Sequence, residues 1–296
     1  MTRYSPIVLF AYNRPTHTLA CLRSLQANEA AQCSDLYVYC DGPPEGASTD
    51  LQNAIRQTRE VIKRGKWCGH MEMFEAATNI GCDASMRRGI SEIIESLDTA
   101  IILEDDLLVG PQWLDFVNDG LTTYKDDNRV GAISGYMYPV THRRLPTAFF
   151  NRFLNFWGWG TWQRAWNLFE SDAGSLLRKL DEQSLTTRFA LGRPIYIEYL
   201  KALQTREDSY DILWYATLLA RDMFVLYPGT SLVSNQGFDL SGTHLAVLDG
   251  PNFAFLNQRP STGRIDITMS TPYEDLDVTA AMEEANAYIW PERSSI

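Results

Sequence analysis

The first third of this chain alternates short apolar runs with longer amphipathic segments, and no other feature restricts the fold as strongly. The apolar runs lie at 7–12, 36–40 and 100–103. The segments between them carry apolar residues at helical spacing, as in Pro15 to Gln26. Strands that alternate with helices form βαβ units, in which the strands run parallel and the helices cover the sheet. The pattern therefore predicts an α/β fold with a mixed, mostly parallel sheet flanked by helices.

The same periodicity places further elements along the chain. Helices are expected at 50–63, 83–97, 171–183, 195–205 and 211–222, and strands at 71–74 and 130–135. After residue 135 the pattern becomes irregular and aromatic, which indicates an elaborated second half. We see no internal repeat, low-complexity tract or charged linker. We therefore predict a single domain over 1–296, with two functional halves at 1–135 and 136–275 and a tail at 276–296.

Composition and charge exclude several classes of protein. The 296 residues are 45% hydrophobic, which is enough to bury a sizeable core. A net charge of −11 opposes attraction to phosphate backbones, so nucleic acid is not an expected partner. No apolar run approaches the roughly 20 residues of a membrane-spanning helix, and the first residues leave no room for a signal peptide. Five cysteines without a CxxC pair suit a reducing compartment. We expect a cytoplasmic protein without a transmembrane segment or a disulfide framework.

Three carboxylates, Glu104, Asp105 and Asp106, directly follow the buried run at 100–103. Carboxylates at the end of a buried strand repel one another unless a cation offsets their charge. Oxygen ligands suit Mn²⁺ or Mg²⁺, and a diphosphate can complete the octahedral shell. The alternative is an exposed acidic turn that caps the following helix, which is the commoner outcome for a short motif by itself.

Other polar residues follow neighbouring strands. Arg14 comes after the first strand and Asp41 after the second. Since ligands of open α/β sheets bind beyond the carboxyl ends of the strands, we expect both residues to converge with the acidic triplet. Arg14 can clamp a phosphate or form a surface salt bridge, and Asp41 can accept from uracil or ribose or form an Asx turn. Asp83 follows Gly81, which permits close approach to a ligand, and its alternative role is a helix cap.

An aromatic segment opens the second half. Trp157, Trp159 and Trp162 interleave with Gly158 and Gly160. Aromatic faces suit sugar rings, and glycine lets the backbone approach a substrate, so the segment can shape a sugar pocket. A buried aromatic cluster is the alternative, and composition alone favours it.

Four segments together resemble a known family. They are PIVLFAYNRP, LYVYCDGPP, NIGCDASMRRG and AIILEDDLLVGPQWLDF. In this order and spacing they are similar to the nucleotide-binding half of GT-A glycosyltransferases. The triplet with its following Leu and Pro is especially similar to the Golgi N-acetylglucosaminyltransferase I family. The resemblance covers Ile7 to about Phe116 and reappears more loosely at 158–160, 210–211 and 235–244. It implies a GT-A, Rossmann-like fold whose first half binds a nucleotide-sugar and whose second half receives the acceptor.

The resemblance also implies roles for individual residues. Asp106 would contact the Mn²⁺ or Mg²⁺ ion, and Asp211 would be the catalytic base. His244 belongs to a late segment that closes over the phosphates, and its alternative role is structural. The residues expected to bind the UDP-sugar are Arg14, Asp41, Asp83, Glu104, Asp105 and His244.

These roles predict a metal-dependent, inverting glycosyltransferase that moves a hexose or N-acetylhexosamine from a UDP-sugar to a glycan or another hydroxyl acceptor. Alternatives are a retaining transferase, a nucleotidyltransferase or a carbohydrate-binding protein without turnover. The first strand is not followed by the glycine-rich phosphate loop that a nucleotidyltransferase ordinarily has. Two features depart from the family: Tyr210 stands where a tryptophan often precedes the base, and no Golgi stem or anchor is encoded. The acceptor therefore does not follow from the resemblance.

Overall fold

The computed structural model describes residues 4–140, 142–191, 193–205, 209–239, 258–268 and 270–289. Within them, an eight-stranded sheet has the order β3-β2-β1-β4-β8-β6-β9-β7. Its strands are β1 (Ile7–Ala11), β2 (Asp35–Cys40), β3 (His70–Glu75), β4 (Thr99–Glu104), β6 (Val130–Ser134), β7 (Ala148–Asn151), β8 (Trp159–Trp162) and β9 (Phe224–Pro228). A separate antiparallel pair joins β5 (Leu107–Val109) to β10 (Val233–Asn235).

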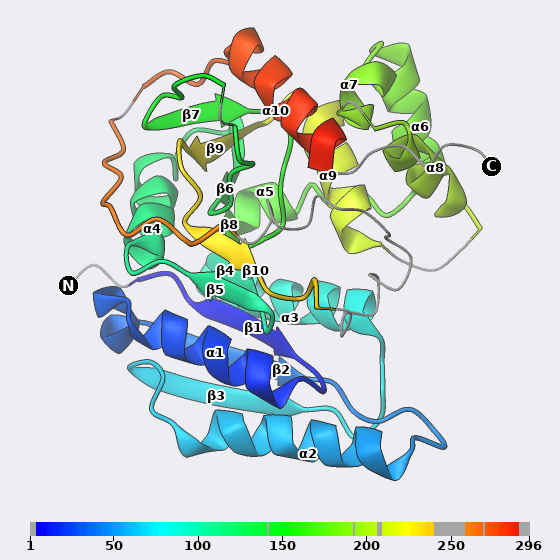
Figure 1. Ribbon diagram of the computed structural model, residues 1–296. Coiled ribbons are helices and arrows are strands. Elements are labelled where there is room, and N and C mark those ends of the chain that lie inside the picture. The colour runs from blue at the N-terminus through cyan, green and yellow to red at the C-terminus, as the bar shows by residue number, and fades with distance from the viewer. Residues whose placement is uncertain are drawn as a thin grey trace.

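Helices flank this sheet on both faces (Figure 1). In the first half they are α1 (Pro15–Gln26), the short 3₁₀ helix η1 (Glu29–Cys33), α2 (Thr49–Arg64), α3 (Cys82–Leu97) and α4 (Trp113–Thr123). In the second half they are α5 (Gln163–Trp166), α6 (Ala173–Glu182), α7 (Thr186–Ala190), α8 (Ile195–Ala202), α9 (Tyr210–Ala220) and α10 (Leu276–Ile289).

The first four strands of the order run parallel to one another. β8 pairs antiparallel with both β4 and β6, β9 pairs parallel with β6, and β7 closes the sheet antiparallel to β9. The fold is therefore mixed α/β with a mostly parallel sheet flanked by helices, which confirms the predicted class.

Local sequence explains where the first elements begin. All five residues of β1 are buried, as a central strand covered on both faces requires. α1 begins at Pro15, whose missing amide hydrogen costs nothing in a first helical turn. Ser48 caps α2 by accepting a hydrogen bond from the Leu51 amide. α3 follows Gly81, whose φ of 88° lies in the left-handed region that favours glycine.

Strand order decides where a ligand site can form. The chain passes from β1 to β2 and β3 in one direction and then places β4 on the opposite side of β1. α1 and α2 lie together on one side of these strands, whereas α3 packs on the other (Figure 1). The connections from β1 and to β4 therefore run on opposite faces of the sheet, which makes the boundary between these two strands a topological switch point. Such a switch point is the usual ligand site of open α/β sheets.

Two tryptophans of the aromatic segment lie inside the sheet and not in a sugar pocket. Trp159 and Trp162 belong to β8 and are 0% and 2% exposed. A side chain at Gly160 would press on Val117 and Leu121 of α4, so this glycine serves helix packing. For Trp159 and Trp162 the buried aromatic cluster was the correct alternative, because β8 is a central strand covered by helices. Trp157 precedes β8 and is only partly buried, so its place in a sugar pocket stays a prediction.

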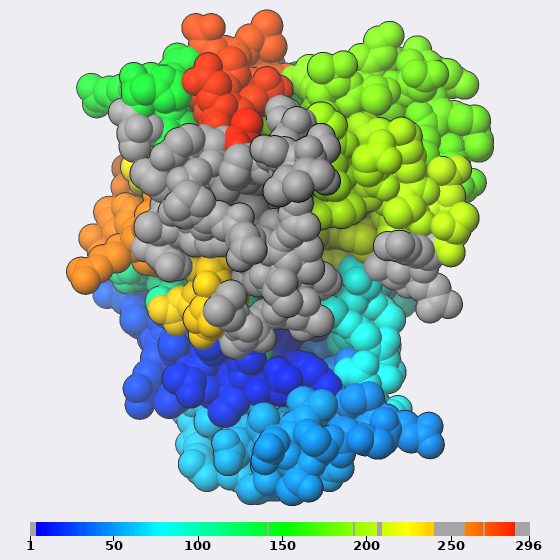
Figure 2. Space-filling view, turned by 45° about the vertical axis from the view of Figure 1, so that its right-hand side comes forward, coloured from blue at the N-terminus to red at the C-terminus, as the bar shows by residue number. Residues whose placement is uncertain are grey.

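A single cluster of buried apolar side chains continues through both halves of the chain. In the space-filling view the first half, blue to cyan, forms the lower part of the visible face, and green and yellow parts of the second half lie above it (Figure 2). The region expected as a tail holds α10, which buries Val278 and Met282. Among the described residues no helix has the length and apolar character needed to cross a bilayer.

Candidate active site

Arg14 and the acidic triplet meet at the switch point. Arg14 lies between β1 and α1, and the triplet spans the end of β4 and the turn that follows it. The guanidinium donates from Nη2 to Asp105 Oδ1 at 2.5 Å and from Nη1 to Asp106 Oδ2 at 3.0 Å. The expected convergence of Arg14 with the triplet is therefore present, as a bridge between one cation and two carboxylates.

Asp105 is held by donors of the protein on both oxygens. Besides the Arg14 bond at Oδ1, its Oδ2 accepts from the Tyr12 amide and from the Thr18 hydroxyl, both at 3.3 Å. Its side chain is 4% exposed. Such saturation makes Asp105 the fixed anchor of the cluster, because moving it would leave several buried donors without a partner.

Asp106 is bound on one side only. Oδ2 accepts from Arg14, whereas Oδ1 is buried and has no hydrogen-bond partner among the described residues. A buried carboxylate oxygen without a donor is costly, and a hard cation satisfies it. Asp106 therefore fits the role of a metal ligand.

The remaining ligands of such an ion would have to come largely from the substrate. No group of three His, Cys, Asp or Glu side chains in the described ranges is arranged to hold a metal. Mg²⁺ commonly binds through one or two carboxylates together with water and substrate phosphates. A buried carboxylate oxygen without a described donor, as at Asp106 Oδ1, suits that mode.

Burial dominates the electrostatics of the cluster. It raises the pKa of Glu104 well above its usual range, and the neighbouring Asp106 charge adds to this. Burial also raises the pKa of Asp105, although Arg14 opposes the shift. For Arg14 burial acts to lower the pKa, but Asp105 and Asp106 outweigh it and the net shift is upward. The guanidinium is thus a permanent cation beside two carboxyl groups, Glu104 and Asp105, whose pKa values are raised.

Asp41 lies at the end of β2 and holds a neighbouring loop. Oδ1 accepts from the amides of Gly42 and Ile80, at 2.8 and 2.9 Å. Oδ2 accepts from Asn79 Nδ2 at 2.9 Å and from the Gly81 amide at 3.1 Å. Three of these donors come from residues 79–81, so the carboxylate is engaged in joining its own loop to the segment before α3. Its expected contact with the nucleotide stays a prediction.

Asp83 joins the two halves of the chain. It lies in the first turn of α3, and its Oδ1 accepts from the Tyr210 amide, the first of α9, at 3.0 Å. Asp83 therefore acts as a helix cap, but for a helix 127 residues further along the chain rather than for its own. Its expected contact with the UDP-sugar remains untested.

Asp211 occupies the first turn of α9. Its Oδ1 accepts from the Ser209 hydroxyl and from the Ile212 amide, and no described residue donates to Oδ2. The charge of Asp211 contributes, after burial, to the raised pKa of Glu104 and of Tyr210, which places the two carboxylates in one electrostatic environment. Oδ2 is the oxygen left to accept a proton.

The last sequence-predicted site residue, His244, lies outside the described residues. Sequence reasoning named the segment 235–244 but not two of its residues that lie against Asp106. The Gln236 amide donates to the Asp106 carbonyl, and a side chain at Gly237 would collide with Asp106 Oδ2. It also missed Thr18, whose position one helical turn after Arg14 was an available signal.

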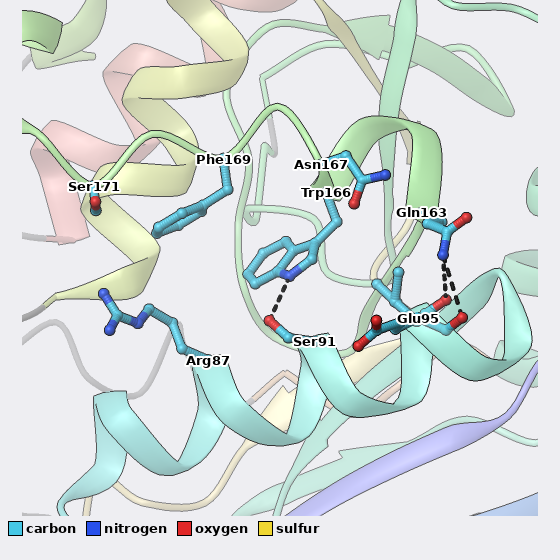
Figure 3. Close-up of a pocket in the computed structure, with 9 residues that line it drawn as sticks. Arg87, Ser91, Glu95, Gln163, Trp166, Asn167, Phe169 and Ser171 are labelled. Carbon is cyan, nitrogen blue, oxygen red and sulfur yellow. Dashed lines mark hydrogen bonds between the residues drawn. The ribbon is translucent and has the colours of Figure 1, made fainter.

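Two surface hollows lie away from this cluster. One has a volume of about 540 Å³ and lies between α3 and the chain following β8, with Trp166, Phe169 and Asn167 on one side and Arg87 and Glu95 on the other (Figure 3). Trp166 donates from its indole to Ser91 across it. The other lies along α2. Neither hollow is lined by Arg14 or by a carboxylate of the triplet.

Comparison with known proteins yields only distant structural likenesses. No protein-family model matches the chain, and no curated protein matches it. TarS of S. aureus is similar with a TM-score of 0.32 and 13% identity, over 49% of this chain and 24% of TarS. An active-site mutant of LgtC is similar with a TM-score of 0.39 and 13% identity, over 71% of this chain and 69% of LgtC.

Both of these proteins are glycosyltransferases, and this chain spans about a quarter of the length of TarS. Their TM-scores lie below 0.5, so the likenesses carry no weight in assigning a function. The expected link to the N-acetylglucosaminyltransferase I family stays a prediction. The function therefore has to be inferred from the site.

Proposed function

We propose that this chain is a metal-dependent, inverting glycosyltransferase that moves a sugar from a UDP-sugar to a hydroxyl acceptor. One observation carries the proposal. At the switch point of the sheet, a cationic Arg14 and the half-unsatisfied Asp106 lie together, with the Asp211 carboxylate within electrostatic reach of the same cluster. Cation and carboxylates in one cluster match the demands of a diphosphate leaving group and a proton acceptor.

The described residues divide the chemistry between them. Arg14 offers a guanidinium fork for the diphosphate oxygens, and Asp105 holds that fork in place. Asp106 would hold Mn²⁺ or Mg²⁺, which supplies positive charge to the departing diphosphate when bound. Asp211 keeps Oδ2 open for the proton of the acceptor hydroxyl.

Transfer then follows by single displacement. The acceptor oxygen attacks the anomeric carbon, the bond from that carbon to the diphosphate oxygen breaks, and the hydroxyl proton passes to Asp211. Attack from the side opposite the leaving group inverts the anomeric centre. A product with the configuration of the donor would exclude this mechanism.

The proposal predicts that UDP binding depends on both the metal and Asp106. We expect calorimetry with Mn²⁺ to show UDP affinity falling at least about tenfold on chelation and in Asp106→Ala. Asp115→Ala is the matched control, because Asp115 is a nearby carboxylate in the sequence and lies in the first turn of α4, outside the cluster. Unchanged UDP affinity after chelation and in Asp106→Ala would refute the metal assignment. Release of UDP from a panel of UDP-sugars then tests turnover.

A further inference from the structure

The two aspartates that bind Arg14 differ in how firmly the protein holds them. Asp105 has donors on both oxygens, including the backbone amide of Tyr12 and the hydroxyl of Thr18. Asp106 has the Arg14 bond on Oδ2 and a buried Oδ1 without a partner among the described residues. Of the two side chains, Asp106 can therefore change partner without breaking bonds to the scaffold.

Arg14 is itself fixed at its backbone but not at its tip. Its carbonyl accepts from the amide and the hydroxyl of Thr18, both at 2.9 Å, which locks the junction of β1 and α1. The Arg14 side chain is 19% exposed, and within the described part of the chain its hydrogen bonds to carboxylates go to Asp105 and Asp106. Rotation of the outer side chain can exchange the Asp106 bond for another anion while the Asp105 bond remains.

We propose that the Arg14 guanidinium is the resident cation of this site and competes with a divalent metal for Asp106. A metal on Asp106 meets a carboxylate whose charge Arg14 already offsets, so the metal alone binds weakly. A diphosphate supplies Arg14 with a new anionic partner and removes the competitor. The role of the diphosphate rests on the proposed function, and it makes metal binding and nucleotide binding strengthen each other.

The proposal predicts that removal of the Arg14 guanidinium changes the affinities for metal and for diphosphate in opposite directions. A guanidinium that only clamps phosphate has no effect on metal alone, and one that only supports folding weakens both ligands. Removal of a competing cation should instead strengthen metal binding and weaken diphosphate binding. Coupling between two ligands in proteins is typically about 5- to 150-fold, which sets the scale of the expected changes.

The experiment measures Mn²⁺ binding without nucleotide, by calorimetry and by the electron paramagnetic resonance signal of free Mn²⁺. We expect Arg14→Gln to bind Mn²⁺ roughly tenfold more tightly than the wild type. Arg14→Lys keeps the positive charge, and its Mn²⁺ affinity should lie between those of the wild type and Arg14→Gln. Arg23→Gln, on the exposed face of α1, makes the same change in net charge and should leave Mn²⁺ affinity unchanged. Asp106→Asn should abolish the gain.

A second titration adds UDP. It should tighten Mn²⁺ binding roughly tenfold in the wild type and much less in Arg14→Gln. Equal or weaker Mn²⁺ binding by both Arg14 variants would overturn the competition. Tighter Mn²⁺ binding without any response to UDP would support the competition at Asp106 and would count against the proposed function instead. If Arg14→Gln does not fold, the Arg14→Lys measurement decides by the same criterion.

Discussion

Single carboxylates in this protein have distinct tasks that follow from their partners. Asp105 and Asp41 have donors on both oxygens and hold the scaffold, whereas Asp106 and Asp211 each keep one oxygen without a described donor. A carboxylate saturated by the protein has little capacity left for a metal or a proton. A carboxylate oxygen without a described donor therefore distinguishes candidate metal ligands and bases from carboxylates that stabilise the fold.

Asp211 provides the clearest test at this scale. Asparagine keeps an oxygen for the Ser209 and Ile212 donors but removes the proton acceptor. We therefore expect Asp211→Asn to fold and to bind UDP normally, while transfer slows by about 10²- to 10⁴-fold.

Asp172→Asn is the matched control, because Asp172 caps α6 by accepting from the Ser175 amide and lies outside the site. It should leave both unfolding temperature and rate unchanged, since Asn caps about as well as Asp. Steady-state kinetics of the two variants settle the matter. Near-normal turnover in a folded Asp211→Asn protein would remove Asp211 from the role of base.

At the scale of elements, the site depends on contacts between helices that are distant from each other in the sequence. α9 packs against α3, and the Asp83 carboxylate binds the first amide of α9. The negative charge also suits the positive end of the α9 dipole. This contact fixes where α9 begins and hence where Asp211 is presented.

Removing the Asp83 carboxylate should show whether it positions Asp211 or binds the donor. In Asp83→Ala we expect kcat to fall about 10- to 100-fold, since a small displacement of a catalytic group is costly, while the KM for the UDP-sugar changes little. Stability should fall by about 0.5–2 kcal/mol, as for other lost caps.

Asp83→Asn retains an acceptor oxygen and should restore kcat, whereas Asp50→Ala in the first turn of α2 should have no effect. The sequence predicts instead that Asp83 contacts the donor. A raised KM with an unchanged kcat, not rescued by Asn, would favour that direct contact.

At the scale of the whole molecule, residues near the end of the chain are tied to the second half through one buried carboxylate. The Glu274 side chain is 6% exposed and pairs with Arg152 at 3.1 Å and with Arg188. It also accepts from the Thr279 hydroxyl. The segment leading into α10 is thereby joined to β7 and α7.

Breaking this network should destabilise the protein without touching the chemistry. Glu274→Ala leaves Arg152 with Asp222 as an ion-pair partner and removes the Glu274 carboxylate from Arg188, and we expect a loss of about 1–3 kcal/mol in the free energy of unfolding. Asp266→Ala is the control, because it breaks an exposed ion pair with Arg264 and should cost at most about 1 kcal/mol. Denaturant titration of both variants measures the difference. Equal losses would show that the buried network contributes no more than a surface pair.

The sequence by itself determined the four parallel strands of the first half, the helices α1, α2 and α3, and the strand ends at which polar residues lie. Apolar periodicity is a local property, so Pro15–Gln26 and the strand ending at Glu104 could be located from spacing alone. The parallel order then followed, because βαβ units leave few other topologies.

Only the tertiary structure decided which polar groups are satisfied. Asp105 and Asp106 are adjacent and chemically identical in the sequence, yet one is saturated and the other is not, because their donors come from residues about 90 positions away. The partner of Asp83 and the burial of β8 were equally hidden, since both depend on packing between segments distant in the chain. Burial and hydrogen bonding depend on long-range contacts, which the local pattern of apolar and polar residues does not predict.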